Sequence, residues 1–186
     1  MGYEEKETAL IRKLEATYYQ ERLKEVKEEQ SKKEGLKDII SSEEMPWEAC
    51  QQGTIKHLLN EKMDTRIKTL DIYMQLIPGG SRSGKHRHIA EEYMFILEGK
   101  GYSLHWDVDM ELRDEGYFWK AQEEPSRWEW ERGDSVYIPP NTVHQHFNTD
   151  PYNPLRFIAA ESRIMKYMGL DDLEQLENAP EFEEKK

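Results

Sequence analysis

Residues 80–99 (GSRSGKHRHIAEEYMFILEG) and residues 133–148 (GDSVYIPPNTVHQHFN) contain four of the six histidines of this chain. In the first stretch, His86 and His88 are two positions apart. Because side chains alternate faces along a strand, that spacing puts both imidazoles on one face. Glu92 follows four residues after His88 and has the same parity if the strand is regular. One strand–turn segment is therefore expected to direct two imidazoles and a carboxylate toward one point.

The second stretch indicates a strand, a tight turn at Pro139–Asn141 and another strand that begins near His144. In an antiparallel barrel this hairpin can lie across from the first segment and bring His144 to the same point. Three imidazoles and one carboxylate suit a divalent cation such as iron, manganese, nickel, cobalt or zinc. Ligands supplied from one wall leave coordination positions open for water, dioxygen or substrate.

The chain around these stretches favours an all-β fold. Short strand-like runs are separated by Gly, Pro, Asp and Asn, without a helical period between them, which favours an antiparallel sandwich or barrel. Residues 107–126 are expected to connect two strands, with a hairpin around 117–120. Residues 4–34 predict a mostly polar helix that ends near Gly35, and the pattern is again helical after Ala160. The eight predicted strands cover 55–59, 70–77, 92–97, 102–106, 127–131, 135–138, 145–148 and 155–160.

Both stretches resemble the two sequence motifs of the cupin superfamily, and the likeness covers about residues 70–160. The first motif is matched at Gly80, His86, His88, Glu92 and Gly99, and the second at Gly133, Pro139, His144 and Asn148. Asn141 stands where the family usually has glycine, and asparagine tolerates the left-handed backbone that such a turn requires.

The resemblance implies a double-stranded β-helix, which is a jelly-roll barrel, with His86, His88, Glu92 and His144 as metal ligands. The chain would then have a helical extension over 1–52, a single cupin barrel over 53–162, and a short helix with an acidic tail over 163–186.

Two further residues are candidates for catalysis. His146 has the strand parity of His144, so we expect it either to contact substrate or a proton, or to orient a ligand through a hydrogen bond. Tyr73 and Gln75 form the polar side of an otherwise apolar strand. If that side faces the barrel interior, Tyr73 serves as a general acid or base and Gln75 contacts substrate. The alternative is that both face solvent.

The remaining candidates have plainer alternatives. Arg82 and Lys85 precede His86 in a loop, where they either bind an acidic substrate or are solvated cations. His57 and His105 are expected at the surface or as hydrogen-bonded core residues, and Asn148 as a structural residue at a strand end. Trp128 and Trp130 alternate with glutamates, which indicates a half-buried strand whose aromatic side belongs to the core or to a subunit interface rather than to a stacking site.

For function, the constellation predicts a non-haem iron dioxygenase-type oxidoreductase that acts on a small oxygenated or aromatic acid. Ferrous iron is the first choice of metal, with manganese, nickel or zinc as alternatives. The segment 139–148 is similar to that of gentisate-type dioxygenases, although those are longer two-domain cupins whose first motif lacks a glutamate ligand. The alternatives are a non-oxidative metal-dependent isomerase, lyase or decarboxylase, or a cupin that only binds a small molecule.

The composition limits which classes of partner and which cellular location are expected. The chain has 186 residues, a net charge of −12 and a single cysteine. Its cations form no cluster, which argues against nucleic-acid binding, and no apolar run is long enough for a membrane span. The first residues lack the apolar core of a secretory signal, so we expect a reduced, cytoplasmic location. The thinly apolar helix and the aromatic content predict a homodimer that acts on a small molecule.

Overall fold

The computed structural model describes residues 2, 16–31 and 35–183, which belong to two compact units, residues 1–36 and residues 37–186. In the first unit, helix α2 (Tyr18–Ser31) has no buried residue. Its surface carries an ion pair between Lys24 and Glu28, one helical turn apart. This helix confirms the middle of the helix predicted over 4–34, and the remainder of that range, apart from residues 16 and 17, lies outside the described residues.

The second unit is built almost entirely from short strands, as a jelly roll requires. After the 3-10 helix η1 (Ser42–Glu44), the chain forms β1 (Trp47–Cys50), β2 (Gly53–Leu59), β3 (Leu70–Ile77), β4 (Lys85–His88), β5 (Glu92–Glu98), β6 (Lys100–Trp106), β7 (Val108–Arg113), β8 (Gly116–Ala121), β9 (Ser126–Glu131), β10 (Ser135–Ile138), β11 (Val143–Asn148), β12 (Leu155–Ser162), α3 (Ile164–Tyr167) and β13 (Leu173–Glu177).

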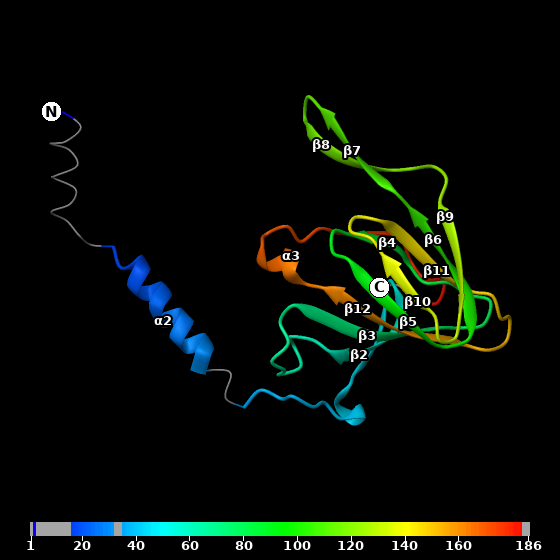
Figure 1. The fold of residues 1–186 in the computed structure, drawn as a ribbon, viewed down its shortest axis with the longest axis horizontal. Coiled ribbons are helices and arrows are strands. Elements are labelled where there is room, and N and C mark those ends of the chain that lie inside the picture. The colour runs from blue at the N-terminus through cyan, green and yellow to red at the C-terminus, as the bar shows by residue number, and fades with distance from the viewer. Residues whose placement is uncertain (1, 3–15, 32–34, 184–186) are drawn as a thin grey trace. The chain divides into compact units, whose positions relative to one another are not determined.

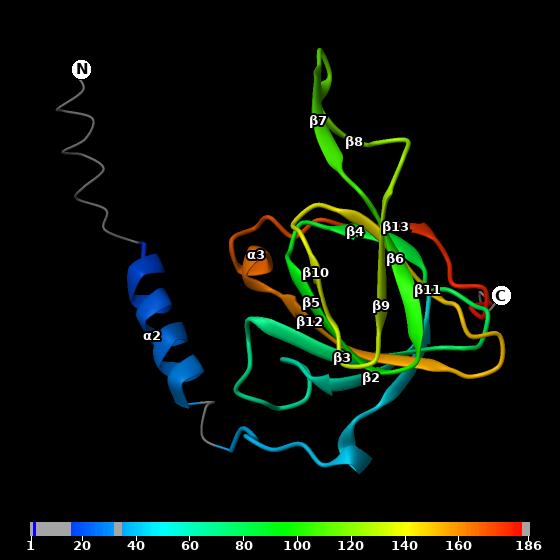
Figure 2. The same cartoon turned by 45° about the vertical axis from the view of Figure 1, so that its right-hand side comes forward.

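These strands form two main sheets that face each other around one interior (Figures 1 and 2). The larger sheet has the order β1-β2-β3-β12-β5-β10, and the smaller has the order β13-β4-β11-β6-β9. Strands β7 and β8 form a separate hairpin that projects away from the barrel in both views. The all-β jelly-roll prediction is confirmed, together with all eight predicted strands. The hairpin predicted within 107–126 is present, with its turn at residues 114–115 rather than around 117–120.

The core lies between the two sheets and follows the two-residue period of the strands. Along β5, buried Met94 and Ile96 alternate with the half-exposed Tyr93 and Phe95, and Phe157 on β12 is fully buried. Burying a side chain of this size contributes about 1.5–3 kcal/mol. The apolar core cluster comprises Ile77, Met94, Ile96, Trp130, Val136, Ile138, Leu155, Phe157 and Ala159.

The unit boundaries differ from those predicted at residues 53 and 162. The second unit begins at Lys37, because β1 pairs with β2 in the larger sheet. The segment predicted as an acidic tail contributes β13, which pairs with β4 in the smaller sheet. Side chains along β13 are exposed, so backbone pairing rather than apolar burial holds this edge strand. For the same reason, its sequence shows no alternation of apolar and polar residues. The predicted C-terminal helix is present as α3.

Candidate metal centre

The register of the smaller sheet brings histidines from three strands side by side. His144 on β11 lies directly opposite His86 on β4 and opposite His105 on β6. Residues opposite each other in an antiparallel pair point to the same face. The ring centroids of His86 and His144 are 4.1 Å apart, and that of His88 is 5.0 Å from His144.

Glu92 completes the cluster from the opposite sheet. The expected shared parity of Glu92 with His86 and His88 requires that their strand continue regularly, and this condition is not met. The chain turns at residues 89–91, and Glu92 is the first residue of β5 in the larger sheet. The ligand atoms of His86, His88, Glu92 and His144 nevertheless lie within 4.8 Å of one another, and all four residues are buried. Both walls of the barrel therefore supply the site.

Two backbone carbonyls fix the tautomers of His88 and His144. His88 Nδ1 lies 2.8 Å from the carbonyl oxygen of Ala90, and His144 Nδ1 lies 2.9 Å from that of Thr142. A carbonyl oxygen only accepts, so each Nδ1 carries the proton and donates it. In the neutral rings Nε2 is then left with a lone pair, which is the form that binds a metal ion.

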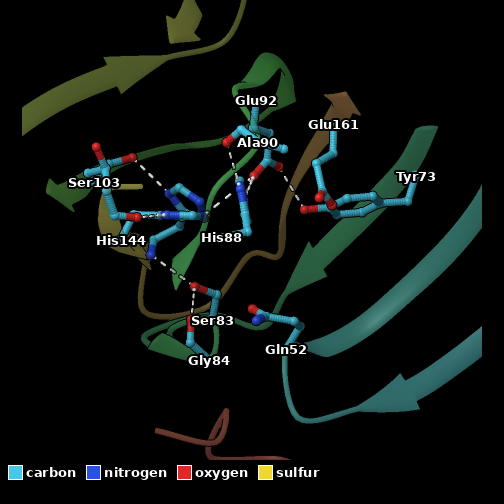
Figure 3. Close-up of polar contacts among 12 residues, drawn as sticks. Gln52, Tyr73, Ser83, Gly84, His88, Ala90, Glu92, Ser103, His144 and Glu161 are labelled. Carbon is cyan, nitrogen blue, oxygen red and sulfur yellow. Dashed lines mark hydrogen bonds and ion pairs between the residues drawn. The ribbon is translucent and has the colours of Figure 1, made fainter. Parts of the chain in front are cut away.

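Those two lone pairs meet a carboxylate. His88 Nε2 lies 3.0 Å from Glu92 Oε2, and His144 Nε2 lies 3.5 Å from the same oxygen without a hydrogen bond. Figure 3 shows Glu92 beside His88 with its other oxygen toward Tyr73. Three acceptors that face one another in a buried space require a cation between them, either a proton or a metal ion.

The pKa shifts of the cluster residues also favour a cation between them. Burial lowers the pKa of His86 well below its ordinary value, and the neighbouring His144 adds to this. Burial acts to raise the pKa of Glu92, but the neighbouring His144 and His88 outweigh it and hold that pKa well below the usual range. Burial likewise lowers the pKa of His88, but Glu92 outweighs it and raises that pKa. His86 Nδ1 is buried with no hydrogen-bond partner. This donor set fits a divalent transition metal.

Tyr73 faces the interior and contacts the cluster through Glu92. Its hydroxyl donates to Glu92 Oε1 across 2.7 Å, which leaves Oε2 facing the two histidines (Figure 3). Burial, with the charge of Glu92, raises the pKa of Tyr73 well above its ordinary value. The solvent-facing alternative for Tyr73 is wrong, and its hydroxyl is engaged in orienting the carboxylate.

His146 is buried one strand period beyond His144, as its parity predicts, and stays outside the four-residue cluster. Its Nδ1 lies 2.8 Å from Ser103 Oγ, which also accepts a hydrogen bond from Trp130 Nε1. Burial, together with His144, holds the pKa of His146 well below its ordinary value, so the ring is neutral at neutral pH. The ring centroids of His146 and His144 are 5.5 Å apart.

The other predicted substrate contacts have partners of their own. Gln75 is buried, and its amide donates to the backbone oxygen of Gln52, so the solvent-facing alternative is wrong for Gln75 as well. Arg82 and Lys85 both pair with Glu177 of β13, and Lys85 also lies over the Trp106 ring. The structure therefore does not bring Gln75 or Arg82 into the metal cluster.

The structure also shows the environment of three residues for which the sequence predicts only a surface or structural role. Asn148 is structural, because its amide donates to the backbone oxygens of Ile77, Pro78 and Asn153. His57 is half-buried and pairs with Glu48 at 2.7 Å. His105 is buried, but its Nε2 has no hydrogen-bond partner, and burial together with His144 lowers its pKa to about 4. Sequence reasoning missed the position of His105 beside His144.

Comparison with known proteins agrees with this architecture. A family model described as a cupin domain matches residues 72–161. The chain is 25% identical over 130 residues to auxin-binding protein T85 of Nicotiana tabacum, a match that covers 69% of this chain and 65% of that protein. It is 29% identical over 101 residues to an uncharacterized protein of Methanocaldococcus jannaschii, covering 54% of this chain and 66% of the relative. Each match spans slightly less than two thirds of the relative's length.

Among solved structures, CapF with the inhibitor 3-isopropenyl-tropolone shares the fold over 72% of this chain and 34% of CapF, with a TM-score of 0.50 and 14% identity. Identity at this level shows the fold alone. Among the described residues, no helix has the length and apolar character needed to cross a membrane.

Proposed function

We propose that this chain is a metal-dependent enzyme whose metal is held by His86, His88, Glu92 and His144. The premise is that residues 72–161 form a cupin domain. Ferrous iron is the first choice, with manganese, nickel or zinc as alternatives. The reaction we propose is a dioxygenase-type oxidation of a small oxygenated or aromatic molecule.

One observation supports this proposal above the others. The Nε2 lone pairs of His88 and His144 both point at a buried carboxylate oxygen, at 3.0 Å and 3.5 Å. Both Nδ1 protons are already committed to backbone carbonyls, so the rings are held with their lone pairs toward the centre. A site kept in this arrangement is prepared for a cation, because a buried, unpaired carboxylate is otherwise strongly unfavourable.

The surrounding residues then have distinct tasks. Tyr73 holds Glu92 in one orientation by its hydrogen bond to Oε1. Because Trp130 N–H already donates to Ser103 Oγ, the serine hydroxyl proton is free to donate to His146 Nδ1. Neutral His146 would then present an Nε2–H group, available as a proton donor close to the centre. A bound ferrous ion would supply the open coordination positions and the electrons that dioxygen chemistry needs.

The second candidate function is small-molecule binding without turnover. It is favoured by the match to a protein that is named for binding auxin. A non-oxidative isomerase, lyase or decarboxylase would use the same ligands with a metal that polarises a carbonyl group.

We further propose a homodimer in the cytoplasm, with a small molecule as its ligand. The outer face of the larger sheet carries Tyr93, Phe95 and Leu97 on β5, each more than a third exposed, and a second copy would cover them. Sedimentation of the purified chain as a monomer would contradict the dimer.

The metal assignment is tested by elemental analysis of protein purified without an affinity tag. Wild type and His57→Ala are expected to retain stoichiometric metal, because His57 pairs with Glu48 away from the cluster. His144→Ala should lose most of it while its circular dichroism stays unchanged. Full metal content in His144→Ala would refute the ligand assignment.

Dioxygen consumption by the iron-loaded wild type, with a panel of phenols and hydroxy acids, tests the reaction. Uptake that depends on substrate supports the oxidative proposal. Tight binding of a panel member without dioxygen uptake or product would assign the binding role instead.

A further inference from the structure

The barrel is open along one seam. Strand β9 is the edge of the smaller sheet and β10 is the edge of the larger one. A cavity of about 430 Å³ lies at this seam, lined by His105 of β6, Trp128 and Trp130 of β9, and the chain that enters and forms β10. None of the four candidate ligands lines the cavity, and among its lining residues His105 has its ring 6.4 Å from that of His144.

Trp128 offers an uncovered aromatic surface to this cavity. It has the strand parity of the buried Trp130, and it lies opposite Ser103, whose side chain is inside the barrel. Trp128 is nevertheless 56% exposed, whereas Trp130 is 5% exposed. The sequence interpretation assigns both tryptophans to the core or to a subunit interface. Only Trp130 is core, and the indole of Trp128 is available to stack on another ring.

His105 forms the inner wall of the same cavity. It is 7% exposed, and its Nε2 has no hydrogen-bond partner. Nε2 is fully enclosed, so the small exposed part of the ring that lines the cavity belongs to its other atoms. The ring centroid of His105 is 6.4 Å from that of His144, and the two residues are opposite each other in the sheet.

Besides His105, a series of side-chain contacts links the cavity wall to the metal centre. Trp130 Nε1 donates to Ser103 Oγ, which contacts His146 Nδ1 at 2.8 Å, and His146 lies beside His144. A molecule in the cavity would therefore touch His105, whose ring lies near that of His144, and Trp130, which is linked to His146 through Ser103. This placement suits a substrate rather than an incidental surface ligand.

The charge of the lining selects the kind of molecule. Glu129 and Asp134 are the charged residues of the lining, and it contains neither lysine nor arginine. Glu129 is paired with Arg127, whose guanidinium lies over the Tyr102 ring. No cation lines the cavity to pair with a carboxylate ligand, and Asp134 would repel one.

We propose that the seam cavity binds a neutral hydroxylated aromatic molecule, with its ring against Trp128 and its hydroxyl hydrogen-bonded to the exposed side of the His105 ring. This replaces the acid that the sequence predicts as substrate. That the bound molecule is also the substrate rests on the proposed metal-dependent function, whereas its binding does not.

The test uses three matched probes on the full chain, zinc-loaded to keep it diamagnetic: phenol, anisole and benzoate. Anisole lacks the hydroxyl proton of phenol, and benzoate adds a negative charge to the same ring. Protein-observed NMR follows the indole N–H signals, with that of Trp128 identified by its absence in Trp128→Ala. Phenol is expected to shift the Trp128 signal and to bind at least tenfold more tightly than benzoate and several-fold more tightly than anisole.

Three variants locate the site. Trp128→Ala and His105→Phe should each weaken phenol binding at least fivefold with unchanged zinc content. Trp47→Ala removes a comparably exposed tryptophan on the distant edge strand β1 and should leave phenol binding unchanged. Because Trp128 is exposed, its variant is expected to fold even if His105→Phe does not.

Unchanged phenol binding in Trp128→Ala, or tighter binding of benzoate than of phenol, would overturn the proposal. Dissociation of a dimer by Trp128→Ala without any loss of phenol binding would overturn it too, and would assign Trp128 to a subunit interface. If the wild type takes up no metal, the proposed function fails, and the phenol titration is read on the metal-free chain with the same criteria.

Discussion

The hydroxyl of Tyr73 on β3 donates to Glu92 Oε1 on β5 across 2.7 Å, from a strand that is separated from β5 by β12. This bond turns the second carboxylate oxygen toward His88 and His144. The hydroxyl of a tyrosine thus determines which face of a glutamate the metal would meet.

Tyr73→Phe should therefore weaken metal binding without loss of the fold. Removing a hydrogen-bond partner of a metal ligand typically lowers metal affinity by about 10–100-fold, and we expect about tenfold here. Competition with a chromophoric chelator measures the affinity. Tyr152→Phe removes a hydroxyl from an 89% exposed side chain and is the control. Equal affinities of the two variants would show that Tyr73 does not orient the carboxylate.

Asn141→Gly is expected to destabilise the protein, although Asn141 has a positive φ of 60° where cupins usually have glycine. Relief of the left-handed backbone would contribute up to about 1 kcal/mol. Against this, the Asn141 side chain accepts a 2.7 Å hydrogen bond from the buried Arg87 guanidinium. Loss of a partner by a buried donor costs about 1–3 kcal/mol. Urea unfolding should therefore give a lower free energy of unfolding for the variant.

Asp64→Gly is the matched control for this substitution. Asp64 also has a positive φ, of 54°, but its side chain is exposed. Replacement by glycine should be neutral or slightly stabilising. A gain in stability for Asn141→Gly similar to that of Asp64→Gly would mean that the bond to Arg87 contributes little.

Ser103→Ala should lower stability by about 1–3 kcal/mol, because it leaves the Trp130 indole N–H and His146 Nδ1 without their shared partner in the core. Metal content should stay unchanged, since His146 is not in the ligand cluster. Ser135→Ala removes an exposed hydrogen bond to Tyr93 and should change stability by less than about 0.5 kcal/mol. Loss of metal from Ser103→Ala would show that the metal site depends on the hydrogen bonds of Ser103 to His146 and Trp130.

Asp71→Asn should stabilise the protein at neutral pH and not in acid. Burial raises the pKa of Asp71 above its ordinary 3.8, and one carboxylate oxygen has no partner. An acid whose pKa is higher in the folded state disfavours folding once the pH rises through that pKa. Chemical unfolding should therefore show a stability gain for the variant at pH 7 that shrinks as the pH approaches 3.8 and below.

Asp150→Asn is a control for which the expected change in stability has the opposite sign. Hydrogen bonds from the backbone N–H groups of Asn153 and Tyr152 lower the pKa of Asp150. An acid with a lowered folded-state pKa stabilises the fold above its unfolded pKa, and the stabilisation is lost as the pH falls through the folded value. Asp150→Asn should reduce stability at pH 7. A gain in both variants would point to net charge rather than to the local environment.

The sequence carried enough information for the barrel and for the convergence of His86, His88 and His144. Strand alternation is a local rule and places His86 and His88 on one face, whereas the addition of His144 from β11 rests on the resemblance to the two cupin motifs. It did not reveal that Glu92 crosses to the other sheet, because parity holds only within a regular strand and the turn at 89–91 interrupts it.

Other features depend on pairing between strands far apart in the chain. His105 is opposite His144 only because β6 adopts one particular register against β11, which no short-range pattern specifies. The orientation of Tyr73 toward the interior is tied to Glu92 on β5, and the strand β12 lies between them in the sheet. Strand β13 is exposed and acidic, so the periodicity that reveals buried strands is absent there.

Strand β13 also affects the order in which the strands of the smaller sheet can pair during synthesis. It pairs with β4, the strand that holds His86 and His88, and Glu174 reaches back across 87 positions in the chain to the buried guanidinium of Arg87. During translation, β4 therefore leaves the ribosome long before its outer neighbour does. The histidine pair stands on an unfinished sheet edge until residues 173–177 emerge, so the smaller sheet is completed only after all its other strands have been made.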